Sequence, residues 1–246
     1  MDITIYLIMA AALAGGALVK GATGMGLPLV ALPALTAFFG LQHAISILTI
    51  PILVTNVAQV WRFRSVRGEA RVRFLPAIVA GGLVGVVLGT WLLVSLPERQ
   101  LLFSLGVLLI VYIVLRLTNP NFVVSQDLGR KAALPVGLGA GMLQGATGIS
   151  APLGVTFIHA MKLDRDAHVF AVSAMFLGFG VVQFVSLIVS GVMQTDWLIQ
   201  GVLALIPIIV FMPVGQWLAG KLSAKAFDRL ILIFLGVIGL KLVLGL

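Results

Sequence analysis

The sequence predicts an all-α, polytopic membrane protein with two inverted-topology repeats, each a broken (re-entrant) helical hairpin plus three transmembrane helices. Three observations lead to this fold class: the composition, the lengths of the apolar segments, and a glycine-rich stretch that occurs twice. Of the 246 residues, 61% are hydrophobic and 10% are charged, whereas soluble domains average roughly 45–50% apolar and about 25% charged. The charged side chains are too few to cover the surface of a soluble protein of this size. Lipid must therefore contact most of the exterior.

Residues 1–40 are predicted to form the first broken hairpin. Its apolar segments, 3–19 and 27–39, flank the glycine-rich stretch Gly21–Pro28. The second segment is too short to cross a hydrocarbon core of ~30 Å, which needs about 20 helical residues. Glycines allow a close turn and leave N–H groups without helical partners, and Pro28 suits the first turn of the following half-helix.

Three longer apolar segments, 43–61, 74–94 and 100–117, complete the first repeat, residues 1–117. The loop 62–73 between the first two carries a basic run of Arg62, Arg64, Arg67, Arg71 and Arg73. A basic loop between apolar segments is typical of the cytoplasmic side of a membrane protein. The net charge of +8 is therefore interpreted as topology, and binding of nucleic acid is not expected.

A polar stretch, 118–131, is predicted to be a cytoplasmic linker, with Asn119-Pro120 as a helix stop. The second repeat, 132–246, begins with a hairpin whose apolar segments are 132–144 and 151–161. Three segments long enough to span follow it, at 168–190, 197–219 and 227–245. The two repeats together would form one transmembrane domain.

The two halves are interpreted as an internal duplication. Gly145-Ala146-Thr147-Gly148 copies Gly21-Ala22-Thr23-Gly24 at an offset of 124 positions, and the same offset pairs Gln59 with Gln183. The five arginines of the loop 62–73 have no basic counterpart at 191–196, so the charge bias reverses between the copies. Under the positive-inside rule, the repeats therefore have opposite orientations.

Inverted repeats with discontinuous helices are typical of secondary transporters, in which the breaks line the substrate site. Helix N-termini each carry about half a positive charge and favour an anion. Hydroxyls in the breaks can donate to an oxyanion, and an ionisable Lys20 at membrane depth is a functional candidate. Snorkelling of Lys20, helix capping by the hydroxyls and interhelical bonding by the amides remain the structural alternatives. The predicted substrate-binding residues are Lys20, Gly21, Thr23, Gly24, Gly26, Asn56, Gln59, Gly145, Thr147, Gly148, Ser150 and Gln183.

Other chemistries find little support in the sequence. The chain has no cysteine, and its eight acidic residues lie at segment ends or in loops, so no metal site and no cofactor are expected. An intramembrane hydrolase would have to use Ser150 and His159, which a helix would separate by about 13 Å. No catalytic residue is therefore predicted, and the chain is not expected to be an enzyme.

The two copies of Gly-Ala-Thr-Gly, each followed four residues later by Pro28 or Pro152, resemble the repeated signature of the sulfite exporter TauE/SafE family of membrane permeases. The resemblance covers nearly the whole chain. It implies movement of small sulfur-containing or carboxylate anions, such as sulfite and sulfoacetate, across the bacterial inner membrane, often outward.

The sequence is thus interpreted as that of a secondary anion transporter, an exporter, in which one repeat rocks or gates against the other. The alternatives are a passive anion channel or facilitator, a carboxylate permease, and a membrane subunit whose arginine-rich loop 62–73 docks an acidic partner. The expected partners are the small anion and the lipid bilayer. A homo-oligomer remains open.

Overall fold

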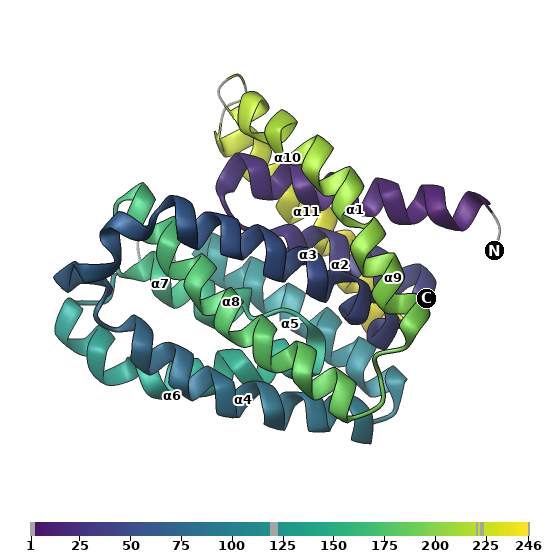
Figure 1. The fold of residues 1–246 in the computed structure, drawn as a ribbon, viewed down its shortest axis with the longest axis horizontal. Coiled ribbons are helices and arrows are strands. Elements are labelled where there is room, and N and C mark those ends of the chain that lie inside the picture. The colour runs from purple at the N-terminus through teal and green to yellow at the C-terminus, as the bar shows by residue number, and fades with distance from the viewer. Residues whose placement is uncertain (1–2, 119–122, 220, 222–223, 246) are drawn as a thin grey trace. The chain divides into compact units, whose positions relative to one another are not determined.

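The structure is a computed structural model that describes residues 3–118, 123–219, 221 and 224–245 (Figure 1). These residues form helices and contain no strand. The chain divides into two compact units, each assembled from separate stretches of sequence. Unit 1 comprises Met1–Pro51, Pro97–Ile113 and Met193–Leu246, and unit 2 comprises Ile52–Leu96 and Val114–Val192.

Unit 1 is organised around α1 (Ile3–Thr23), which packs against both α10 (Leu205–Ala219) and α2 (Leu27–Phe39). α9 (Thr195–Leu203) precedes α10 and contacts it. α11 (Ala224–Leu244) contacts α2, so that this unit collects helices from both ends of the sequence (Figure 1). The first part of α3 (Leu41–Arg62) and most of α5 (Glu98–Thr118) also belong to it.

Unit 2 is organised around α4 (Leu75–Ser95), which packs against α6 (Gln126–Thr147) and α8 (Arg165–Val189). Two short 3-10 turns, η1 (Arg64–Gly68) and η2 (Ala70–Val72), connect α3 to α4. After α6 the chain forms a π-helical turn, η3 (Ala151–Val155), which continues as α7 (Thr156–Ala160).

The close contact between α4 and α6 depends on glycines along both helices. A Cβ atom on Gly81 would lie 2.2 Å from the carbonyl oxygen of Leu134, and one on Gly145 would lie 2.3 Å from that of Val86. These are backbone atoms that cannot move aside, so only glycine allows the helices to approach so closely. Small residues are the usual means of such packing between membrane helices. The glycines in this contact are Gly81, Gly85 and Gly89 on α4 and Gly137, Gly141 and Gly145 on α6.

The contact between α1 and α10 in unit 1 follows the same arrangement. A Cβ on Gly21 would lie 2.0 Å from the Met212 oxygen, just as one on Gly145 would meet Val86. Gly21 and Gly145 are 124 positions apart, and Val86 and Met212 are 126 apart. Each unit therefore packs a helix that ends at a Gly-Ala-Thr-Gly motif against a long helix from the other half of the sequence.

Helices suited to a membrane confirm the prediction of an all-helical, multi-pass protein. Six stretches among the described residues are long and apolar enough to cross a bilayer: Tyr6–Thr23, Leu41–Arg62, Ala70–Ser95, Glu98–Thr118, Arg165–Val189 and Thr195–Leu218. Ile206 and Ile209 on α10 are 62% and 65% exposed. Lipid would cover such an exposed apolar face.

Several predicted boundaries differ from the structure. α1 contains a stretch of spanning length, although the sequence predicted only the short arm 3–19. α6 has 22 residues and begins at Gln126, because the Ser125 hydroxyl accepts the Leu128 N–H at 3.3 Å and starts the helix within the predicted linker. Apolar runs alone underestimate a helix whose first turns are polar. The predicted helix stop, Asn119-Pro120, lies outside the described residues.

Candidate functional site

The first break is a glycine-capped turn after α1. The helix ends at Thr23, and the Gly24 N–H donates to the Lys20 carbonyl oxygen at 2.8 Å. Gly24 has a φ of 79°, the left-handed conformation that commonly terminates a helix. The Thr23 hydroxyl donates to the Val19 carbonyl oxygen at 2.9 Å and accepts the Met25 N–H at 3.3 Å. This hydroxyl therefore hydrogen-bonds both the last turn of the helix and the residues that follow it.

The second break, after α6, repeats these bonds. The Gly148 N–H donates to the Gln144 carbonyl oxygen at 2.8 Å, and Gly148 has a φ of 74°. The Thr147 hydroxyl donates to the Leu143 oxygen at 2.7 Å and accepts the Ile149 N–H at 3.4 Å. Because the same motif makes the same bonds twice, Gly-Ala-Thr-Gly determines the local backbone of both breaks.

The breaks diverge two residues after the capping glycine. Gly26 has a φ of 98° and precedes α2, a helix of 13 residues with Pro28 in its first turn. The equivalent residue, Ser150, has a φ of −108° and precedes the π-helical turn η3. Gly26 thus needs the conformational freedom of glycine, whereas position 150 accepts a side chain with a hydroxyl.

Burial also separates the two breaks. Thr23 is exposed, and Gly24 is half-buried. Thr147, Gly148 and Ser150 are all buried. The Ser150 Oγ has no hydrogen-bond partner among the residues that the structure describes. A buried hydroxyl without a partner is unfavourable by about 1–3 kcal/mol, which marks the second break as a place where a polar ligand would be stabilising.

Lys20 is 2% exposed and lies one turn before the first break. Its counterpart at the offset of 124 is Gln144, which is also buried. Gln183 joins the second break from α8, because its Nε2 donates to the Gln144 carbonyl oxygen at 2.9 Å. Among the predicted residues, the structure thus brings Gln183 together with the turn that contains Gly145, Thr147, Gly148 and Ser150.

The other predicted amides make bonds between or within helices. The Ser173 hydroxyl on α8 donates to the Gln59 Oε1 at 3.0 Å, which joins α8 to α3. The Asn56 Nδ2 donates to the Ile52 carbonyl oxygen at 2.7 Å within α3. These bonds join Asn56 to the backbone of α3 and Gln59 to α8.

Thr90 on α4 was missed by the sequence analysis. A Cβ on Gly145 would lie 2.7 Å from the Thr90 backbone nitrogen, so Thr90 lies directly against the second break. Its side chain is buried, and its Oγ1 has no hydrogen-bond partner in the described part of the chain. The sequence does contain a signal for Thr90. Gly89-Thr90 corresponds to Gly215-Gln216 at an offset of 126, which marks a second position that is repeated between the two halves.

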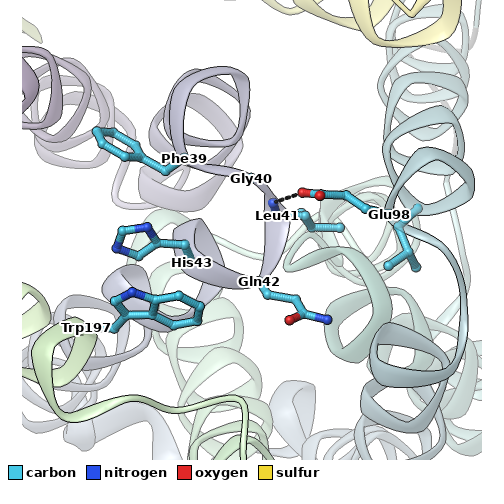
Figure 2. A pocket seen from close by; sticks show the side chains of 8 residues that line it. Phe39, Gly40, Leu41, Gln42, His43, Glu98 and Trp197 are labelled. Carbon is cyan, nitrogen blue, oxygen red and sulfur yellow. Dashed lines mark hydrogen bonds between the residues drawn. The ribbon is translucent and has the colours of Figure 1, made fainter.

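Unit 1 contains a separate cavity of about 220 Å³ at the corner between α2 and α3 (Figure 2). The His43 ring stacks on Trp197 with centroids 4.5 Å apart, and its Nε2 lies 2.6 Å from the Gln200 Oε1. On the other side of the cavity, the Glu98 Oε1 accepts the Leu41 N–H at 3.1 Å. Glu98 brings a carboxylate to its lining, and the described lining residues include no lysine or arginine, so this cavity does not suit an anion. None of its residues belongs to the predicted site.

Comparison with known proteins identifies the family. Residues 7–242 match the family described as Sulfite exporter TauE/SafE, which covers nearly the whole chain. No curated protein and no solved structure matches the sequence. The chain therefore belongs to the sulfite exporter TauE/SafE family, a family of membrane transporters, as the repeated motif predicted.

Proposed function

We propose that this member of the TauE/SafE family is a secondary transporter that exports a small sulfur-containing anion, such as sulfite or sulfoacetate, across the bacterial cytoplasmic membrane. It does so by alternating access, in which the bound anion is exposed first to one side of the membrane and then to the other. Family membership supports anion export in general. The buried hydroxyl of Ser150, which has no partner among the described residues, is the observation that supports an anion-binding site at the second break.

Each break offers anion-binding groups of its own. Each break ends a helix at a left-handed glycine, Gly24 or Gly148. In the second break, Ser150 donates its hydroxyl hydrogen to an anion oxygen. In the first, Lys20 supplies positive charge, and α2 begins with its N–H groups unbonded within the helix.

The inverted repeat is part of the proposal. Its support is the pair of matching crossings, in which Gly21 meets Met212 and Gly145 meets Val86. Two copies of one structure in opposite orientations can take up two equivalent arrangements, which is the usual basis of alternating access in secondary transporters.

The test is transport by the purified full-length chain in liposomes. Uptake of radiolabelled sulfite is measured into vesicles loaded with unlabelled sulfite, sulfoacetate, acetate or buffer. An alternating-access transporter accumulates label transiently when the vesicles contain its substrate. Each unlabelled anion that moves out leaves the binding site facing the outside, where it binds labelled sulfite and carries it in. A channel does not accumulate label in this way, so uptake without transient accumulation would reject alternating access.

The site is tested with Ser150→Ala, matched by Ser104→Ala. Both changes remove one serine hydroxyl, but the Ser104 hydroxyl is exposed and bonded to the Gln100 carbonyl oxygen at 2.7 Å. We expect Ser150→Ala to raise the KM for the anion about tenfold, equivalent to about 1.4 kcal/mol, and Ser104→Ala to transport normally. Equal KM values in the two variants would remove Ser150 from the site.

A further inference from the structure

The side-chain amides of Gln144 and Gln183 hold each other in one orientation. The Gln183 Nε2 donates to the Gln144 backbone oxygen at 2.9 Å, which directs the Gln183 Oε1 toward the Gln144 side chain. The Gln144 Nε2 donates to that oxygen at 2.9 Å. Rotating either amide by a half turn would place two oxygens, or two NH₂ groups, face to face. The bonds therefore leave only one arrangement of donors and acceptors.

This arrangement commits the Gln144 Oε1 to be an acceptor that faces away from Gln183. Gln144 is 1% exposed, and no described residue donates to its Oε1. An amide oxygen has no hydrogen and cannot donate to an anion. A fully deprotonated oxyanion beside it would bring two oxygens together without a hydrogen between them.

Two buried hydroxyls border the same break and have no partner in the described residues: those of Ser150 and Thr90. Ser150 is 0% exposed and Thr90 2% exposed. Hydroxyls in helices commonly donate to the carbonyl four residues earlier, as Thr147 does to Leu143. Thr90 does not make this bond. The second break thus offers two hydroxyl donors and one obligate acceptor to a ligand.

We propose that the second break binds its anion with a hydrogen-bond donor attached, so that the recognised species is a small monoanion with acceptor oxygens and one donor hydrogen. The inference rests on the proposed function and specifies its substrate class. Hydrogen sulfite, protonated on oxygen, meets the description, and the sulfite dianion does not. Sulfonates meet it when they carry a hydroxyl group. Sulfoacetate has two ionised groups and no donor, so the inference narrows the proposed substrates by excluding it.

Charged side chains on the surrounding helices are distant from Gln144. α4 contains no ionisable residue. On α6 they are Asp127, Arg130 and Lys131, at least 13 positions away, or about 20 Å along the helix. On α8, Arg165, Asp166 and His168 lie at least 15 positions before Gln183. On η3 and α7, His159 lies nine positions after Ser150. The protonation state of the ligand therefore dominates the pH dependence at the break.

The first experiment measures the Kd of the purified full-length protein for total sulfite by calorimetry, at pH values on both sides of the second ionisation of sulfite. If only the monoanion binds, the Kd for total sulfite rises about tenfold per pH unit above that ionisation. A Kd that stays constant, or falls with rising pH, would overturn the inference.

The second experiment holds the pH constant. It compares 2-hydroxyethanesulfonate with ethanesulfonate, two monoanions that differ by one hydroxyl group. We expect the hydroxylated compound to bind at least about tenfold more tightly, which corresponds to one well-placed hydrogen bond of about 1.4 kcal/mol. If the two sulfonates bind equally while hydrogen sulfite still binds more tightly than sulfite, the donor that the break recognises is a proton on the oxyanion itself, not a hydroxyl group elsewhere in the ligand.

The variant Gln144→Lys replaces the acceptor with the residue found at position 20 in the first repeat. Its ammonium group can still donate to the Gln183 Oε1, so the contact with α8 is retained. We expect its pH dependence to reverse, with tighter binding of the dianion. The matched control is Gln126→Lys, the same change at an exposed position 18 residues earlier on α6, which should bind like the parent protein.

The outcomes separate the inference from the proposed function. Binding of sulfite with no preference for either protonation state, and no reversal in Gln144→Lys, would overturn the inference and leave anion transport standing. Absence of binding and transport for every sulfur oxyanion and carboxylate would overturn the proposed function, and the inference with it.

Discussion

Thr23 and Thr147 occupy the same place in two copies of one turn, and their hydroxyls make the same local bonds. Thr23 is nevertheless exposed, whereas Thr147 is buried. The residues around them differ as well, because Lys20 corresponds to Gln144 and Gly26 to Ser150. A short glycine-rich motif therefore specifies a backbone conformation, and the neighbouring side chains specify its chemistry. The two breaks therefore share one backbone geometry and differ in the side chains beside it.

The largest expected effect concerns the geometry that both breaks share. Gly145→Ala and Gly21→Ala each place a Cβ within 2.3 Å of a carbonyl oxygen on the facing helix. We expect each change to lower the free energy of unfolding by about 3 kcal/mol through overpacking. Thermal unfolding of the protein in detergent measures this effect. Gly15→Ala is the control, because its Cβ would find Val30 at 3.9 Å, and equal losses in all three variants would contradict the packing explanation.

The next effect distinguishes the breaks at their point of divergence. Gly26→Ala forces a residue with a φ of 98° to accept a Cβ 2.9 Å from the Val19 Cγ1. It should destabilise the protein by about 1–2 kcal/mol. Ser150→Gly keeps an ordinary backbone and should alter stability by less than about 1 kcal/mol while weakening anion binding. Chemical denaturation combined with ligand titration checks both, and a reversed order of stabilities would show that the left-handed conformation at position 26 is not required.

Lys20 tests whether charge in the first break serves transport. Lys20→Met keeps an unbranched side chain that is one atom shorter and removes its charge, so we expect anion transport in liposomes to fall about tenfold, or about 1.4 kcal/mol. Lys241→Met is the matched control, because Lys241 is also embedded in an apolar helix but is exposed. Undiminished transport by Lys20→Met would place the anion-binding groups elsewhere.

The smallest effect compares the threonines themselves. Thr147→Val removes a hydroxyl that makes a 2.7 Å bond in a buried turn, and should destabilise the protein by about 1–1.5 kcal/mol. Thr23→Val removes the equivalent bond in an exposed turn, where water can replace it, and should have an effect of about 0.5 kcal/mol or less. Unfolding midpoints of the two variants check this difference. Equal midpoints would mean that the two breaks have the same environment.

Local sequence signals were sufficient for most helix boundaries. α2 covers Leu27–Phe39, as predicted, because Gly26 before it and Gly40 after it have positive φ angles of 98° and 83°, which interrupt a regular helix. The extent of α6 was underestimated, since its polar first turns were assigned to the linker. A helix of spanning length at α1 was also not predicted. Hydropathy measures how apolar a segment is, and helix length depends in addition on caps and packing.

Sequence alone determined that this chain is a helical membrane protein of the TauE/SafE family with two breaks at corresponding positions. Composition and a repeated motif do not depend on contacts between distant residues. Tertiary structure decided which helix faces each break and which polar atoms are left without partners there. Thr90 is far from Ser150 in sequence, and the amide of Gln144 is oriented only by Gln183 on another helix. Hydrogen bonds between distant residues depend on how helices cross, so these features emerged only from the folded chain.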